Sequence, residues 1–161
     1  MPVDSVEHSP WRFRFRLTSL LILFVVTTPA FRWLGYYVDE GKSIVWHPFS
    51  KQVLDEQLAL RQIVLVNFRA EWCLTSVMHD ETFRSPRVRR AVQAEQIVPL
   101  EADWTDGDAR IKQELESHGV STIPTVIIYR SGCEPIILRD IFTEAELIAA
   151  MRAAGRRPYC Q

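Results

Sequence analysis

The chain has 161 residues, 47% of them hydrophobic and 24% charged, so it has room for one globular domain of ordinary size plus an appendage. Nineteen basic and twenty acidic residues give a net charge of -1, which excludes a general attraction to nucleic acid. Three cysteines are too few for a disulfide-dense small protein, and their spacing excludes a four-ligand zinc site.

The first segment of the chain is directed to a membrane. Residues 17–31 are uncharged, and Arg12, Arg14 and Arg16 precede them, which favours an N-terminus inside and the rest of the chain outside. These 15 residues have the length of a signal-peptide core, and continuing to residue 38 gives enough length to span a bilayer. We expect a cytoplasmic tail at 1–16, an anchor or a cleaved signal at 17–38, and a linker at 39–45. A buried core helix at 17–31 is the remaining alternative.

The remainder, residues 46–161, alternates between helical and strand patterns. This order predicts an α/β fold with a three-layer sandwich that closes on an antiparallel hairpin. The expected helices cover 50–60, the segment after Cys73, 108–118 and 143–154, and the expected strands cover 63–68, 97–100, 125–129 and 135–138.

Several runs of sequence carry a family resemblance. The stretch NFRAEWC at 67–73, with Ile123-Pro124-Thr125 downstream, resembles a thioredoxin fold. The runs WHPFS at 46–50, EWCLTS at 71–76, EADWTDGD at 101–108 and EPIILRDIFT at 134–143 are similar to the thioredoxin-like C-terminal domain of DsbD-type membrane thiol reductases. The resemblance covers residues 44–154. It implies a thioredoxin fold (α/β/α sandwich) facing the periplasm or exterior from the inner membrane, with Pro124 in a cis peptide beside Cys73.

Cys73 is the candidate nucleophile. A sulfur at a helix start faces unsatisfied N–H groups and the positive end of the helix dipole, so its pKa falls and a thiolate forms at neutral pH. Trp72 is expected to pack locally or to shape a groove for a partner. An inert, buried cysteine is the alternative interpretation.

The sequence departs from the DsbD-type pattern at two positions. Ser76 stands where the family has the second cysteine of Cys-x-x-Cys, and a hydroxyl cannot resolve a mixed disulfide. Asn67 stands where the family has a buried Asp that assists proton transfer. An amide cannot pass protons to and from the active thiol, and without the negative charge of the Asp we expect Cys73 to ionise more easily. Asp80 falls on a second acidic position of the family, and a solvated helix charge is its simpler interpretation.

The other two cysteines are expected to lie far from Cys73. In a thioredoxin fold, Cys133 follows the strand that leads away from Pro124, and Cys160 follows the last helix, which also runs away from the active edge. We therefore expect a Cys133–Cys160 disulfide, which an oxidising compartment permits. Two independent free thiols are the alternative.

Other site types find little support. Cys73 and His79 lack further ligands for a metal, and we expect His79 on a helix surface. No cofactor motif is present.

The functional hypothesis is an exported, membrane-anchored protein with a single active-site thiol. It would form mixed disulfides with exported proteins or small thiols, and a multispan membrane electron donor is a further partner to consider. A redox-inactive binding module that keeps the fold is the main alternative, and an oxidoreductase completed by a separate cysteine protein is a third. The sequence leaves open whether the protein is an enzyme.

Overall fold

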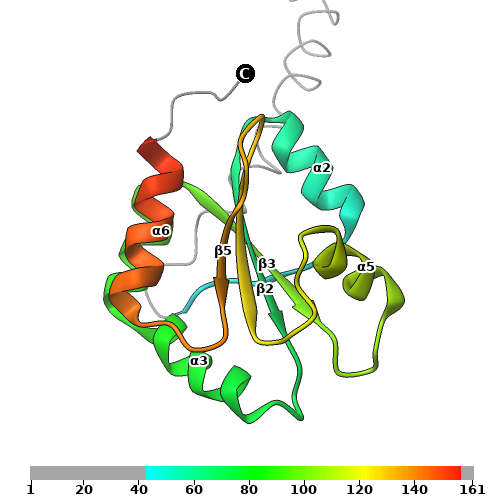
Figure 1. The fold of residues 1–161 in the computed structure, drawn as a ribbon. Helices are drawn as coiled ribbons and strands as arrows, with labels where there is room; N and C mark the ends of the chain where they lie inside the picture. Colours follow the sequence, from blue (N-terminus) through cyan, green and yellow to red (C-terminus); the bar gives the residue numbers. More distant parts are fainter. Residues whose placement is uncertain (1–42, 157–161) are drawn as a thin grey trace, which may run out of the picture. The chain divides into compact units, whose positions relative to one another are not determined.

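A computed structural model describes residues 43–156 (Figure 1). The described strands pair in the order β1-β3-β2-β4-β5. The elements, in chain order, are β1 (His47–Pro48), α2 (Lys51–Ala59), β2 (Ile63–Arg69), α3 (Leu74–Arg84), α4 (Pro86–Ala94), β3 (Ile97–Asp103), α5 (Ala109–Ser117), β4 (Thr125–Arg130), β5 (Ile136–Arg139) and α6 (Glu144–Arg156).

Strand β2 is the centre of the sheet. It pairs in parallel with β3 along one side and antiparallel with β4 along the other. Its sequence, IVLVNFR, is buried at every position except the last, because helices cover both faces of the sheet. β4 and β5 form the antiparallel hairpin that the sequence predicts.

The helices divide between the two faces of the sheet. Figure 1 shows α3 and α6 on one side and α2 and α5 on the other. Because side chains alternate along a strand, Ile63 and Leu65 of β2 point to the first side, where they join a core cluster with residues of α4 and α6. Asn67 and Arg69 continue the same alternation and therefore face α3.

A sharp break separates α3 from α4. Ser85 ends α3 and caps α4, because its hydroxyl accepts a hydrogen bond from the N–H of Arg87. Pro86 follows in the first turn of α4, where its missing N–H costs nothing. The two helices therefore meet at an angle, and α4 packs beside α6.

The expected α/β sandwich and its closing hairpin are confirmed. The short strand β1 was not predicted, and β3 extends three residues beyond the predicted end at residue 100. The expected segments 1–16 and 17–38 and most of the linker lie outside the described residues. Among residues 43–156, no helix has both the length and the apolar character to cross a membrane.

The position of α6 on the sheet gives the first prediction. Leu147 of α6 is completely buried, whereas Ile141, just before the helix, is 74% exposed. Replacing Leu147 with Ala should lower the free energy of unfolding by about 2–5 kcal/mol, because it leaves a cavity in the core. Ile141→Ala should change it by less than about 0.5 kcal/mol. Urea unfolding of both variants checks this, and equal effects would contradict the packing described here.

Candidate functional site

Cys73 lies at the junction between β2 and α3. β2 ends at Arg69, and a tight turn follows in which the N–H of Cys73 donates to the carbonyl of Ala70 at 3.1 Å. Cys73 is the N-cap residue of α3, with extended backbone angles and no side-chain capping bond. Its sulfur therefore sits at the start of an 11-residue helix, as the sequence predicts, and the residue is partly exposed.

The loop before β4 lies against this thiol. The Ile123–Pro124 peptide bond is cis, as the family resemblance implies. The Cys73 thiol points at the carbonyl of Ile123, with 3.8 Å between sulfur and oxygen. The loop is fixed by two further bonds: the Thr125 hydroxyl donates to Thr122, and the N–H of Asp140 donates to the carbonyl of Pro124. The structure thus brings Cys73, Ile123 and Pro124 together.

The surroundings of Cys73 favour its thiolate. Partial burial acts to raise the pKa of the thiol, but the Ser76 hydroxyl and the backbone N–H groups of Ser76 and Thr75 oppose it. The net effect is a pKa below the ordinary value for cysteine. Donors at a helix start stabilise a negative sulfur in this way, so the thiol is chemically suited to nucleophilic attack.

Ser76 lies one helical turn after Cys73 and is only 1% exposed. Its hydroxyl oxygen is buried and has no hydrogen-bond partner within residues 43–156. The hydroxyl lies close enough to lower the pKa of Cys73, because it can donate to a thiolate. Ser76 can therefore stabilise the sulfur anion, but it cannot supply a second sulfur.

Asn67 lies on β2, on the face of the sheet that α3 covers, and is 3% exposed. Its amide oxygen has no hydrogen-bond partner in the described part of the chain. An amide carries no charge and takes up no proton at neutral pH. The buried position below the helix of Cys73 therefore contributes no negative charge against a thiolate.

Asp80 is held by an ion pair that sequence reasoning missed. Arg69, at the end of β2, approaches Asp80 of α3 at 3.6 Å and Glu101 of β3 at 3.9 Å. All three side chains are partly buried, and burial raises the pKa of Glu101 while Arg69 opposes that rise. Asp80 is therefore an ion-pair partner of Arg69 that stays partly exposed, which adds a partner to the solvated helix charge that the sequence suggests. The alternation of β2, which puts Arg69 on the side of α3, is the signal that could have revealed the pair.

Trp72 and its neighbours form an exposed apolar surface beside Cys73. The indole N–H of Trp72 donates to the carbonyl of Thr105, and its ring lies 6.4 Å from that of Trp104. Trp72 is nevertheless 63% exposed. We call this surface, with the exposed residues of α3 and Ile141, the apolar rim. Its members are Trp72, Leu74, Val77, Met78 and Ile141. Apolar residues at 74, 77 and 78 share one helix face, which is the signal that sequence analysis could have used.

His79 does not lie on the helix surface as expected. It is 3% exposed, and its ring lies 4.1 Å from that of Phe142. Neither ring nitrogen has a hydrogen-bond partner among the described residues. Burial lowers the pKa of His79, and nearby Asp80 opposes this only in part. The surface prediction was wrong because α3 is covered by the segment before α6, which the helical pattern alone does not show.

The described residues hold no cluster of side chains suited to a metal ion. Residues 43–156 contain no group of three or more His, Cys, Asp or Glu side chains that could hold a metal ion.

Cys133 is not part of the site. Cys133 lies in the turn between β4 and β5, at the end of β4 opposite Pro124. A strand of six residues separates the two ends by about 20 Å. Cys160 lies outside the described residues, so the Cys133–Cys160 disulfide stays a prediction.

Comparisons with known proteins agree on the fold and the family. The curated relatives include the thiol:disulfide interchange protein DsbD of two Vibrio vulnificus strains, each 26% identical over 94% of this chain. The alignment covers 26% of each DsbD, so this chain spans about a quarter of those relatives.

Solved structures match the same region. The oxidised C-terminal domain of Neisseria meningitidis DsbD has a TM-score of 0.56 at 18% identity, over 68% of this chain and 99% of its own. A thioredoxin from Thermus thermophilus has a TM-score of 0.56 at 20% identity, over 69% of this chain and 86% of its own. These likenesses concern the fold. The thioredoxin-like family matches residues 45–131, more than half of the chain. With a cysteine at a helix start beside a cis-proline loop, the chain belongs to the thioredoxin-like family and is related to the thiol:disulfide interchange protein DsbD.

Proposed function

We propose that this protein is an exported, membrane-tethered thioredoxin-like protein that works through one thiol, Cys73. The observation that carries the proposal is the position of Cys73: it is the N-cap residue of α3, its thiol faces the carbonyl of Ile123, and the pKa of that thiol is lowered. Ser76 occupies the position of the second cysteine, so the chemistry is that of a monothiol.

The reaction is an exchange between one thiolate and one disulfide. The Cys73 thiolate attacks a disulfide of an exported protein or a small molecule. A new S–S bond joins Cys73 to one sulfur, and the other sulfur leaves as a thiolate. Ser76 cannot attack this mixed disulfide, so release requires a thiolate from outside the site. A second thiol, or a multispan membrane donor, would take the disulfide and restore Cys73.

The apolar rim supports exchange with a protein. Exposed side chains on both sides of Cys73 offer an apolar contact surface, and contiguous exposed apolar groups often mark interaction sites. The hydrophobic run at 17–31, with arginines before it, supports tethering to the inner membrane with the domain on the outer side.

The proposal predicts a covalent adduct at Cys73. The full chain, incubated with oxidised glutathione at neutral pH and analysed by mass spectrometry, should gain one glutathione at Cys73, because this thiol is accessible and its pKa is low. Cys73→Ser should gain none at this peptide. If Cys73 stays unmodified while a maleimide labels it readily, the monothiol proposal is wrong and the binding module described below is favoured.

The role of Ser76 can be measured separately. Ser76→Ala should raise the pKa of Cys73, because a hydrogen bond to the thiolate is lost. The rate of alkylation of Cys73 by iodoacetamide, measured as a function of pH, should rise at a higher pH in this variant. At pH values below the pKa of the thiol, the rate should be lower by roughly threefold to tenfold. Ser117→Ala is the matched control, because the hydroxyl of this helix serine donates to the backbone carbonyl of Glu114. It should leave the pH dependence of Cys73 alkylation unchanged. An unshifted curve for Ser76→Ala would show that this hydroxyl does not act on the thiolate.

Restoring the second cysteine tests whether the site is otherwise intact. Ser76→Cys should create insulin-reducing activity in the presence of dithiothreitol, because the new thiol can resolve the mixed disulfide. The parent chain and Ser76→Ala should show background turbidity only. An inactive Ser76→Cys protein, with Cys73 still able to form an adduct, would mean that Asn67 also limits the dithiol cycle, and Asn67→Asp in the Ser76→Cys protein should then recover activity.

A redox-inactive binding module is the second candidate. The observation that favours it is the combined loss at Ser76 and Asn67, which removes the second thiol and the buried carboxylate while the apolar rim remains. In that case partner binding would survive Cys73→Ser unchanged.

A further inference from the structure

Four arginines gather on the side of the domain formed by α4 and α6. We call them the arginine face: Arg87, Arg89, Arg90 and Arg152. Arg87, Arg90 and Arg152 line one hollow of about 370 Å³ between the two helices, together with Glu95. Arg89 and Arg90 line a second hollow of about 190 Å³. Arg90 borders both, so the four side chains form one continuous surface.

Two of the four arginines of the arginine face, Arg90 and Arg152, carry positive charge that no described carboxylate pairs. α4 contains three arginines and no acidic residue. Arg87 pairs with Glu144 at 3.0 Å, while the Nε of Arg90 donates to a backbone carbonyl, that of Pro86. Within residues 43–156, no carboxylate lies at ion-pair distance from Arg90 or Arg152. Because the whole chain has a net charge of -1, this cluster is a local concentration and not a general property.

The chain enters the domain at the edge of this face. Ser43 lines the smaller hollow together with Arg89, Arg90 and Gln93. The proposed membrane segment ends at residue 38, and the five residues 39–43 can span at most about 18 Å. If the tether holds, Ser43 and the arginines around it are confined to the neighbourhood of the lipid headgroups.

We propose that the arginine face binds the anionic phospholipid headgroups of the membrane to which the chain is tethered. Guanidinium groups pair with phosphates in a bidentate manner, and an anionic leaflet attracts basic side chains at its surface. The inference rests on the membrane tether of the proposed function. It adds that the domain turns its arginine face toward the membrane.

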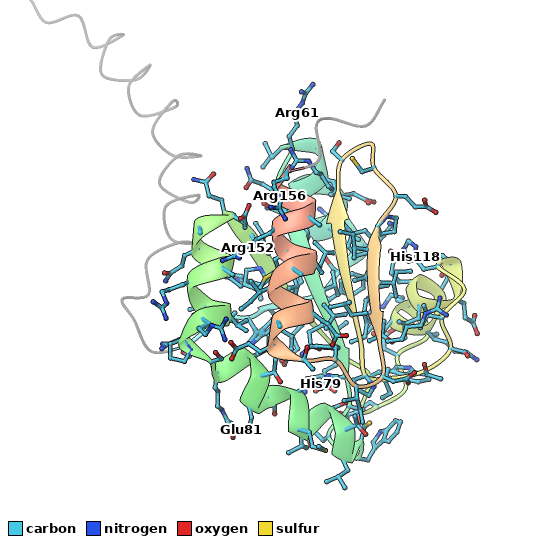
Figure 2. The ribbon with its side chains drawn as sticks, turned by 60° about the vertical axis from the view of Figure 1, so that its left-hand side comes forward. Arg61, His79, Glu81, His118, Arg152 and Arg156 are labelled. Atoms are coloured by element: carbon cyan, nitrogen blue, oxygen red, sulfur yellow. The ribbon has the colours of Figure 1, made fainter. Side chains whose placement is uncertain are left out.

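This orientation keeps the thiol away from the lipid. α3 leads from Cys73 toward α4, and its 11 residues span about 16 Å. Figure 2 shows Arg152 and Arg156 toward one end of α6, with α4 beside it, and His79 of α3 toward the opposite end. A domain that binds lipid through α4 and α6 therefore presents Cys73 and the apolar rim to exported proteins.

The test is arginine labelling of the full chain in vesicles. The chain is reconstituted into phosphatidylcholine vesicles and into vesicles with three parts in ten of phosphatidylglycerol. Phenylglyoxal then labels exposed arginines, which mass spectrometry quantifies one by one. Arg90 and Arg152 should be labelled at least fivefold more slowly with the anionic lipid, since one basic residue near such a surface gains roughly that factor. Arg110 and Arg139, exposed elsewhere on the domain, should be unaffected.

A matched pair of variants isolates the face. In Arg90→Gln/Arg152→Gln, the anionic lipid should no longer protect Arg87. In Arg110→Gln/Arg139→Gln, which loses the same charge, Arg87 should stay protected, and 0.5 M NaCl should remove that protection.

Three outcomes would overturn the inference: equal labelling of Arg90 in both lipids, equal protection of Arg110, or protection that appears only when an acidic protein is added. Two separate measurements examine the proposed function in the same samples. Flotation of the chain with neutral vesicles reports the tether, and the glutathione adduct at Cys73 reports the thiol chemistry.

Discussion

The register between β2 and β4 is the constraint on which the site depends. Phe68 of β2 lies opposite Thr125 of β4, so the residue before Thr125 must lie beside the turn that follows β2. Pro124 is that residue, and Cys73 ends that turn. Because β2 is hydrogen-bonded on both sides and buried on both faces, the strand ends that carry the turn and the proline loop are held side by side. The distance between sulfur and the Ile123 carbonyl is thus set by strand pairing.

Three features around this junction reduce the negative charge close to the thiol. Asn67 puts an amide in the buried position, Ser76 replaces a second ionisable sulfur, and Arg69 holds Asp80 in an ion pair. In a low-dielectric interior, a negative group near a thiolate would raise the pKa of that thiol. Together they leave little unpaired negative charge beside Cys73, in keeping with the lowered pKa of its thiol. The differences from the DsbD-type pattern at Ser76 and Asn67 are mutually consistent, because a site without a second thiol does not need a carboxylate to deprotonate it.

Much of the fold could be predicted from the sequence because its signals are local. Strand β2 is an apolar, β-branched run, Ser50 and Asp108 cap α2 and α5 through their own side chains, and Gly119 ends α5 with a positive φ. Cys73 could be placed at a helix start because it directly follows the strand pattern of β2 and precedes a helical pattern.

The parts that could not be predicted depend on tertiary contacts. His79 is buried because Phe142, 63 residues later, covers it, and no helical pattern contains that information. The pair between Arg69 and Asp80 likewise joins a strand to a helix across the core, and the two-residue strand β1 exists only because β3 offers it an edge. Interactions between distant segments thus decide which polar groups become paired and which apolar groups stay exposed.

The bond from the Trp72 indole to Thr105 has a mechanical consequence. It ties the residue before the thiol to the loop after β3, and the N–H of Glu71 is held by the Thr105 hydroxyl as well. Glu71 and Trp72, the two residues before the thiol, are therefore both hydrogen-bonded to the loop after β3. Under the proposed function, a partner would bring its disulfide to a surface that these two hydrogen bonds hold in place.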